Sequence, residues 1–189
     1  MTLYLIRHGQ TDWNVAGRIQ GSHDSELNEK GSEQARKLGQ TILESQIEFS
    51  TLYTSPQKRA QKTAELIGSV TEKPVVPLKG LEEINLGLWE GLTWKEVELK
   101  YPAEYGQWYD NRRYAKAPGG ESYDEMLKRV LTALHTITST HNDNAAVVTH
   151  GGVIMCLQCY LTDTPFHEMR KFKAENTCIL EIDSSQLVK

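Results

Sequence analysis

Residues 2–9 read Thr-Leu-Tyr-Leu-Ile-Arg-His-Gly, and residues 145–152 read Ala-Ala-Val-Val-Thr-His-Gly-Gly. Each stretch is a short apolar run that ends in a polar turn containing glycine, a pattern typical of a buried strand. Apolar strands that alternate with helices favour a parallel sheet whose two faces are both covered. The two stretches therefore predict an α/β fold with a largely parallel sheet.

The rest of the chain continues this alternation. Further strands are expected at residues 49–54, 74–78 and 177–183, and helices at residues 29–45, 56–67, 121–138 and 151–161. Asn28 is a candidate N-cap for the first helix, and Ser55-Pro56 would supply a cap and an N1 proline for the second. Ser122 and Glu125 have the spacing of a capping box at the start of the third.

The length and the charge of the chain limit the number of domains and the kinds of partner that can be expected. A chain of 189 residues is the size of one domain with a substantial core, so we expect a single domain over residues 1–189. Its 21 Lys and Arg residues and 25 Asp and Glu residues give a formal net charge of −4 at pH 7. Such a chain has no overall field that attracts nucleic acid or an anionic membrane, and we expect neither as a partner. An anionic ligand would need a local group of basic side chains.

The three cysteines, Cys156, Cys159 and Cys178, are too few for a disulfide scaffold. The N-terminus carries no cationic leader, and no run approaches the roughly 20 apolar residues that span a bilayer. These features predict a cytoplasmic protein. Cys156 and Cys159 lie in a predicted helix without a second cysteine pair, so we expect neither a thiol-bound metal nor a redox role.

Residues 89–114 are rich in aromatic side chains. They include Trp89, Trp94, Tyr101, Tyr105, Trp108, Tyr109 and Tyr114. We expect a helical insertion at about residues 89–120, lying over one edge of the sheet. The rings either pack a satellite core, which is the commonest use of aromatic side chains, or line a substrate pocket, and the two interpretations are compatible.

Two histidines occupy matched positions in the predicted fold. His8 follows the first strand and His150 follows the strand at 145–149, each directly before glycine. The carboxyl ends of parallel strands meet at one edge of the sheet and line its ligand crevice. A single histidine there is more often a structural residue, but two at matched strand ends indicate a shared site.

Two other strand ends deliver charged side chains to the same edge. Arg59 falls in the first turn of the helix at 56–67, and Glu83 lies in the acidic loop after the strand at 74–78. Taken singly, an exposed arginine and a solvated acidic loop are the ordinary interpretations. A cation at a helix N-terminus opposes the helix dipole, however, and this favours a bound anion nearby.

The combined set, Arg7, His8, Arg59, Glu83 and His150, suits phosphoryl transfer. Guanidinium groups bind phosphate oxygens bidentately, and a neutral imidazole can attack phosphorus to form a covalent intermediate. The arginines disfavour protonation of His8, which keeps its ring nucleophilic. The second imidazole can offset charge on the equatorial oxygens, while a carboxylic acid protonates the departing oxygen.

The motifs also follow a familiar order. They are the segment 5–14, Gln20-Gly21, Ser55-Pro56 with Arg59, Ala60 and Thr63, Glu83 with Gly87, Trp89, Glu90 and Gly91, and the segment 149–152. In this order they resemble the histidine phosphatase superfamily, in its phosphoglycerate mutase-like branch. The similarity extends from about residue 3 to about residue 160.

The resemblance implies a three-layer α/β/α sandwich in which His8 becomes the phosphohistidine. Glu83 would donate a proton to the leaving group and then act as the base that activates water. The phosphate pocket would comprise Arg7, Arg59 and His150. Further contacts to the phosphate or the substrate would come from Asn14, Gln20, Gly21 and Gly151. The family uses no metal, and we expect no cofactor.

The family contains both phosphatases and mutases that depend on 2,3-bisphosphoglycerate. Similar mutases have a larger insertion, and residues 117–122 look like the phosphatase branch, so hydrolysis of a small phosphorylated substrate is favoured. Arg112 and Arg113 favour a mutase, which holds the substrate carboxylate with two arginines at this place, although a solvated charge cluster is the simpler interpretation. A remote third hypothesis is an inactive phosphate-binding module. Neither the natural substrate nor an oligomeric state is predicted.

Overall fold

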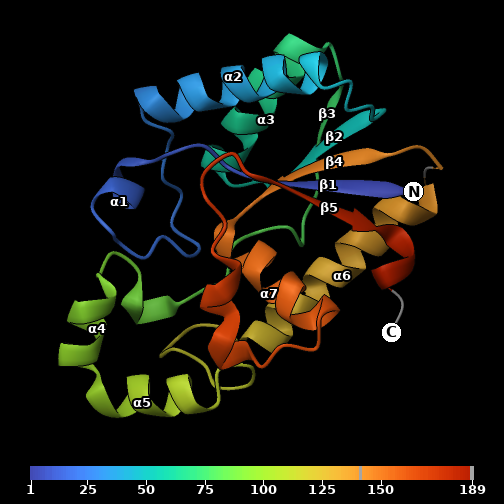
Figure 1. The fold of residues 1–189 in the computed structure, drawn as a ribbon. Coiled ribbons are helices and arrows are strands. Elements are labelled where there is room, and N and C mark those ends of the chain that lie inside the picture. Colours follow the sequence, from blue (N-terminus) through green and yellow to red (C-terminus); the bar gives the residue numbers. More distant parts are fainter. Residues whose placement is uncertain (141, 188–189) are drawn as a thin grey trace.

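The computed structural model describes residues 1–140 and 142–187, and its centre is a five-stranded sheet (Figure 1). The strand order is β3-β2-β4-β1-β5. The strands are β1 (Thr2–Arg7), β2 (Thr51–Thr54), β3 (Val75–Pro77), β4 (Ala145–Thr149) and β5 (Ile179–Asp183). Strands β1 to β4 pair in parallel, and only β5 runs antiparallel to its neighbour β1. The predicted α/β fold with a mostly parallel sheet is confirmed.

Helices cover both faces of the sheet, which gives the three layers seen in Figure 1. On one face lie α2 (Glu29–Glu44) and α3 (Lys58–Thr71), and on the other lie α6 (Tyr123–Thr140) and α7 (Gly151–Leu161). The short helix α1 (Asp12–Val15) lies beyond the carboxyl ends of the strands. Among residues 1–140 and 142–187, no helix combines the length and the hydropathy needed to cross a bilayer.

The two-residue period of the strands explains why both faces need cover. Leu3 and Leu5 of β1 enter the core beneath α6 and α7, whereas Ile6 enters the separate core beneath α2 and α3. Ala145 and Ala146 of β4 divide between the same two cores. Because successive side chains point to opposite faces, an apolar strand buries residues on both sides of the sheet.

Two expected element boundaries are wrong. Helix α3 begins at Lys58 with Gln57 as its N-cap, so Ser55 does not cap it and Pro56 precedes it. The Ser55 hydroxyl is used elsewhere, against the buried ring of His150. The last strand begins at Ile179 because Thr177 has a positive φ of 59°, which interrupts an extended backbone. By contrast, the Asn28 cap and the Ser122–Glu125 capping box are confirmed.

The aromatic segment forms two helices, α4 (Trp94–Lys100) and α5 (Pro102–Asp110), preceded by a 3₁₀ helix at Gly87–Trp89. They lie beyond the carboxyl ends of the strands (Figure 1). Trp89 and Trp108 are buried and pack edge to face, with ring centroids 5.3 Å apart. Both rings belong to the core that lies beneath α6 and α7, so the expected satellite core is not separate, and the insertion extends the main core beyond the end of the sheet.

Candidate active site

His8 directly follows β1 and is almost fully buried. Its Nδ1 lies 2.7 Å from the carbonyl oxygen of Gly9. A carbonyl can only accept a hydrogen bond, so Nδ1 carries the proton and the lone pair lies on Nε2. Burial lowers the pKa of His8 well below its usual value, and the charges of Arg59 and Arg7 lower it further. His8 is therefore neutral near pH 7 and has a nucleophilic Nε2, as the sequence predicts.

Backbone carbonyls hold the two arginines that flank His8. Arg7 donates from Nη1 to Ala174 O at 2.5 Å, and Arg59 donates to His23 O at 2.7 Å and to Gly21 O at 2.9 Å. Arg59 has no exposed surface, and burial lowers its pKa to about 10, so it keeps its charge at neutral pH. These bonds leave the Nε–H of each guanidinium without a partner among the described residues.

His150 N-caps α7 and lies behind His8, with ring centroids 5.3 Å apart. Its Nε2 is 2.8 Å from Ser55 Oγ, which itself accepts a hydrogen bond from Gln57 N at 3.3 Å. The Ser55 O–H can therefore donate to Nε2, which leaves the ring proton on Nδ1. Burial lowers the pKa of His150 well below its usual value, so the ring is neutral. Its Nδ1 is buried and has no partner in the described part of the chain.

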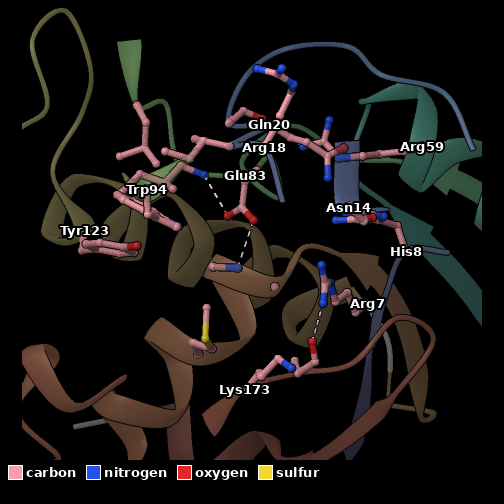
Figure 2. Close-up of a pocket in the computed structure, with 18 residues that line it drawn as sticks. Arg7, His8, Asn14, Arg18, Gln20, Arg59, Glu83, Trp94, Tyr123 and Lys173 are labelled. Carbon is pink, nitrogen blue, oxygen red and sulfur yellow. Dashed lines mark hydrogen bonds between the residues drawn. The ribbon is translucent and has the colours of Figure 1, made fainter. Parts of the chain in front are cut away.

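Glu83 approaches the same site from the loop after β3. Its Oε2 accepts a hydrogen bond from Gly152 N at 2.9 Å and its Oε1 accepts one from Ile84 N at 3.0 Å. Figure 2 shows the carboxyl group between the arginine side of the cavity and Trp94. This position lets an acid act on a group bound next to His8.

These residues surround a cavity of about 270 Å³ at the carboxyl ends of the strands (Figure 2). The lining residues that the sequence singled out are Arg7, His8, Asn14, Gln20, Gly21, Arg59, Glu83 and Gly151. His150 does not line the cavity and reaches it through its contact with His8. Asn14 Oδ1 accepts from Thr11 N and Gln20 Oε1 accepts from Thr11 Oγ1, so one buried threonine orients both amides.

One wall of the cavity consists largely of residues that the sequence did not single out. That wall includes Trp94, Tyr123 and Met155, with Arg18 at the rim. The aromatic insertion pointed to Trp94, but nothing in the spacing marked Met155 or Tyr123. Burial raises the pKa of Tyr123 to about 12, so its hydroxyl stays protonated and can donate a hydrogen bond. Because Trp94 lines the cavity, the insertion contributes to the pocket as well as to the core.

Asn176 is a further residue at the site that the sequence did not predict. Its Nδ2 donates to the carbonyl oxygen of His8 at 2.9 Å and lies 3.3 Å from Asn14 Oδ1. The loop before β5 thereby fixes the backbone of the central histidine. The sequence carried no signal for this contact, because 168 residues separate the two partners.

The expectation that Arg112 and Arg113 bind a substrate carboxylate is not supported, since neither lines the cavity. Arg112 is buried, with its guanidinium 4.2 Å from the centre of the Trp108 ring. Arg113 forms an ion pair with Asp124 at 2.9 Å. Arg112 packs on Trp108 in the core, and Arg113 pairs with the start of α6, so only the partly exposed Arg113 fits the interpretation of a solvated charge.

In the described residues, no group of three or more His, Cys, Asp or Glu side chains is arranged to hold a metal ion. Cys156, Cys159 and Cys178 are all free thiols. Cys156 is buried within α7, and burial raises its pKa well above its usual value, which keeps the thiol protonated.

The sequence and the fold were compared with those of known proteins. The sequence model of the histidine phosphatase superfamily (branch 1) matches residues 3–186. The chain belongs to this superfamily. A metal-independent phosphoserine phosphatase of Arabidopsis thaliana is 37% identical over 163 residues, which cover 85% of this chain and 68% of the relative. A putative phosphoserine phosphatase 2 of Hydrogenobacter thermophilus is 33% identical, over 95% of this chain and 88% of the relative.

Solved structures agree with the sequence relatives. The phosphoserine phosphatase of Entamoeba histolytica, in complex with 3-phosphoglyceric acid, superposes with a TM-score of 0.81 at 32% identity. The match covers 95% of this chain and 89% of that one. This histidine phosphatase is therefore a phosphoric monoester hydrolase, and its substrates are small phosphomonoesters.

Proposed function

We propose that this histidine phosphatase hydrolyses phosphomonoesters through a covalent phosphohistidine on His8, with Glu83 as the proton donor. One observation carries the proposal. Arg7 and Arg59 line the cavity with neutral His8, and the Nε–H of each has no partner in the described chain. The buried Nδ1 of His150, whose ring centroid lies 5.3 Å from that of His8, has no partner there either. Unpaired buried donors are costly, and a phosphoryl group supplies the acceptor oxygens that they lack.

In the first step, the phosphoryl oxygens accept hydrogen bonds from the two arginines and His150. His8 Nε2 attacks phosphorus as the ester P–O bond breaks, and the Glu83 proton passes to the departing oxygen. The Gly9 carbonyl stabilises the positive charge that develops on the His8 ring, because it accepts from Nδ1. The alcohol leaves, and the phosphoryl group stays on His8.

In the second step, water attacks the phosphohistidine. The Glu83 carboxylate takes a proton from this water as the N–P bond breaks, which regenerates neutral His8 and the protonated acid. Inorganic phosphate then dissociates. The positive groups act mainly by fixing the phosphoryl group and offsetting charge on its oxygens, which is the principal demand of this reaction.

Phosphoserine is the first substrate that we propose, because relatives over most of this chain are named as phosphoserine phosphatases. Its small size suits a cavity of about 270 Å³. We propose that residues 1–189 act as one domain in the cytoplasm, without a metal, on a free small molecule rather than on nucleic acid. The free cysteines and the formal charge of −4 support this proposal.

The test is to trap the intermediate. The protein is mixed with ³²P-labelled phosphoserine in the presence of a metal chelator, quenched within milliseconds, and digested for mass spectrometry. We expect phosphate release and an acid-labile label on His8. The variant His8→Ala should form no labelled protein, whereas the matched change His135→Ala, on the exposed face of α6, should behave as the parent.

Three results would contradict the proposal. They are a label on another residue, turnover without any labelled His8, and loss of turnover on chelation. A parent protein that binds phosphate but never turns over would instead be an inactive phosphate-binding module.

A further inference from the structure

Gln57 occupies the N-cap position of α3 but does not use its side chain as a cap. The residue is nearly buried, with 8% of its surface exposed. Long buried amides are costly unless both the oxygen and the nitrogen are paired. The Gln57 amide meets this demand by reaching two loops of the active site.

The nitrogen end of the amide contacts the loop that holds Arg59. Gln57 Nε2 donates to Gly21 O at 2.9 Å, and the same carbonyl oxygen accepts from Arg59 Nη2, also at 2.9 Å. Two donors thus share one carbonyl, which fixes its direction. Since Gly21 O is one of the two acceptors that hold the Arg59 guanidinium, Gln57 contributes to the orientation of the phosphate-binding arginine.

The oxygen end of the same amide contacts Glu83. Gln57 Oε1 accepts from the backbone N–H of Glu83 at 2.8 Å. On the other side of this residue, Arg129 Nη2 donates to Glu83 O at 3.0 Å. Hydrogen bonds therefore hold the backbone of Glu83 on both sides. Only the bond to Gln57 connects Glu83 to Arg59, through the carbonyl oxygen of Gly21.

We propose that Gln57 is a positioning residue that ties the proton donor Glu83 to the phosphate-binding Arg59. The inference rests on the proposed function and adds a residue to it. The Gln57 amide binds the loop after β1 at Gly21 and the loop after β3 at Glu83, so it fixes the positions of both loops relative to the N-terminus of α3. The proton donor then stays in register with the phosphoryl group that the arginine holds.

The two arms have different kinetic consequences. In the first step, displacement of Glu83 slows only those substrates whose leaving oxygen needs a proton, such as phosphoserine, whereas 4-nitrophenolate leaves without one. Displacement of Gly21 O disturbs Arg59 and so weakens the binding of any phosphate. The ratio of the rates on the two substrates reports on the acid arm, and it is insensitive to a general loss of folded protein.

The test compares Gln57→Met, which removes both arms at similar volume, with Gln57→Glu, which keeps an oxygen for Glu83 N–H but loses the donor to Gly21 O. The matched control is Gln61→Met, one turn along α3, because the Gln61 side chain forms no hydrogen bond with residues 1–140 or 142–187. The kcat/KM values, which report the steps up to release of the alcohol, are measured on phosphoserine and 4-nitrophenyl phosphate, and phosphate affinity is measured by product inhibition.

For Gln57→Met we expect kcat/KM on phosphoserine to fall about 10- to 100-fold, the scale typical of a misplaced catalytic group, with a loss about tenfold smaller on the nitrophenyl ester. Inhibition by phosphate should weaken severalfold. Gln57→Glu should keep the parental ratio between the two substrates while it loses phosphate affinity, and Gln61→Met should match the parent.

Equal losses on both substrates in Gln57→Met, or parental kinetics in that variant, would overturn the inference while the phosphatase activity of the parent stands. A parent without activity on either substrate would overturn the proposed function itself. The two failures are therefore distinguishable.

Discussion

The Glu83 carboxyl group rests on the first turn of α7, where its Oε2 accepts a hydrogen bond from Gly152 N at 2.9 Å. A Cβ atom at position 152 would lie 2.4 Å from Glu83 Oε1. The glycine at this place is therefore required by the acid, because no larger residue lets the carboxyl group approach the helix so closely.

Replacement of this glycine by alanine should separate activity from stability. In Gly152→Ala the clash falls on the far end of a movable side chain, so Glu83 is displaced while the helix is retained. We expect turnover of phosphoserine to fall about 10- to 100-fold with little change in melting temperature. The matched change Gly106→Ala, where a Cβ meets nothing within 4 Å, should leave activity intact. A Gly152→Ala variant with parental kinetics would contradict this account of Glu83.

Removal of the acid should affect substrates unequally. Glu83→Gln cannot donate a proton, so we expect kcat on phosphoserine to fall about 10²- to 10⁴-fold. The loss on 4-nitrophenyl phosphate should be much smaller in the first step, because its leaving group needs no proton. Pre-steady-state bursts on both esters measure this step, and Glu98→Gln on the exposed face of α4 serves as the control. Equal losses on both substrates would remove Glu83 from the role of acid.

Protein stability should fall as the pH falls below the ordinary histidine range. Burial lowers the pKa values of His8 and His150 in the folded state. Below about pH 6.5 the unfolded chain binds protons at these rings while the folded chain does not, so the free energy of unfolding decreases. Each ring contributes a slope of up to about 1.4 kcal/mol per pH unit. Urea unfolding between pH 7.5 and 5 measures this slope.

The variant His8→Asn provides the control for this slope. It retains a polar side chain but cannot titrate in this range, so its stability should depend less steeply on pH than that of the parent. A slope identical to the parental one would show that His8 does not stay neutral in the folded protein.

Phosphoryl return to a second substrate should be slow. Neither Arg112 nor Arg113 reaches the cavity, so the pair that would hold a phosphoglycerate carboxylate is missing from it. When 3-phosphoglycerate is mixed with catalytic 2,3-bisphosphoglycerate, we expect release of inorganic phosphate and little 2-phosphoglycerate. Phosphorus NMR follows both products. Interconversion faster than phosphate release would identify the protein as a mutase.

The sequence predicted the framework of the site because that framework follows from local patterns. Apolar strands that end at His8 and His150, and a strand–helix junction just before Arg59, place these residues at one end of a parallel sheet, and the structure brings them together there. The position of Glu83 after a parallel strand also predicted that it lies near the site. Its hydrogen bond with Gly152 N was not predicted. The N-cap of α3 was misassigned because Ser55 bonds to a histidine 95 residues away.

Sequence alone determined the family, the α/β class and the strand ends that carry the charged residues, since these depend on periodicity and on motifs read within a few positions. Tertiary structure alone decided that Gln57 spans two loops, that Arg112 stacks on Trp108, and that Met155 and Tyr123 complete the cavity wall. Such contacts join side chains that are distant in the chain. They depend on the path of each loop and on the rotamer that buries each polar atom beside a partner, and neither is encoded by local spacing.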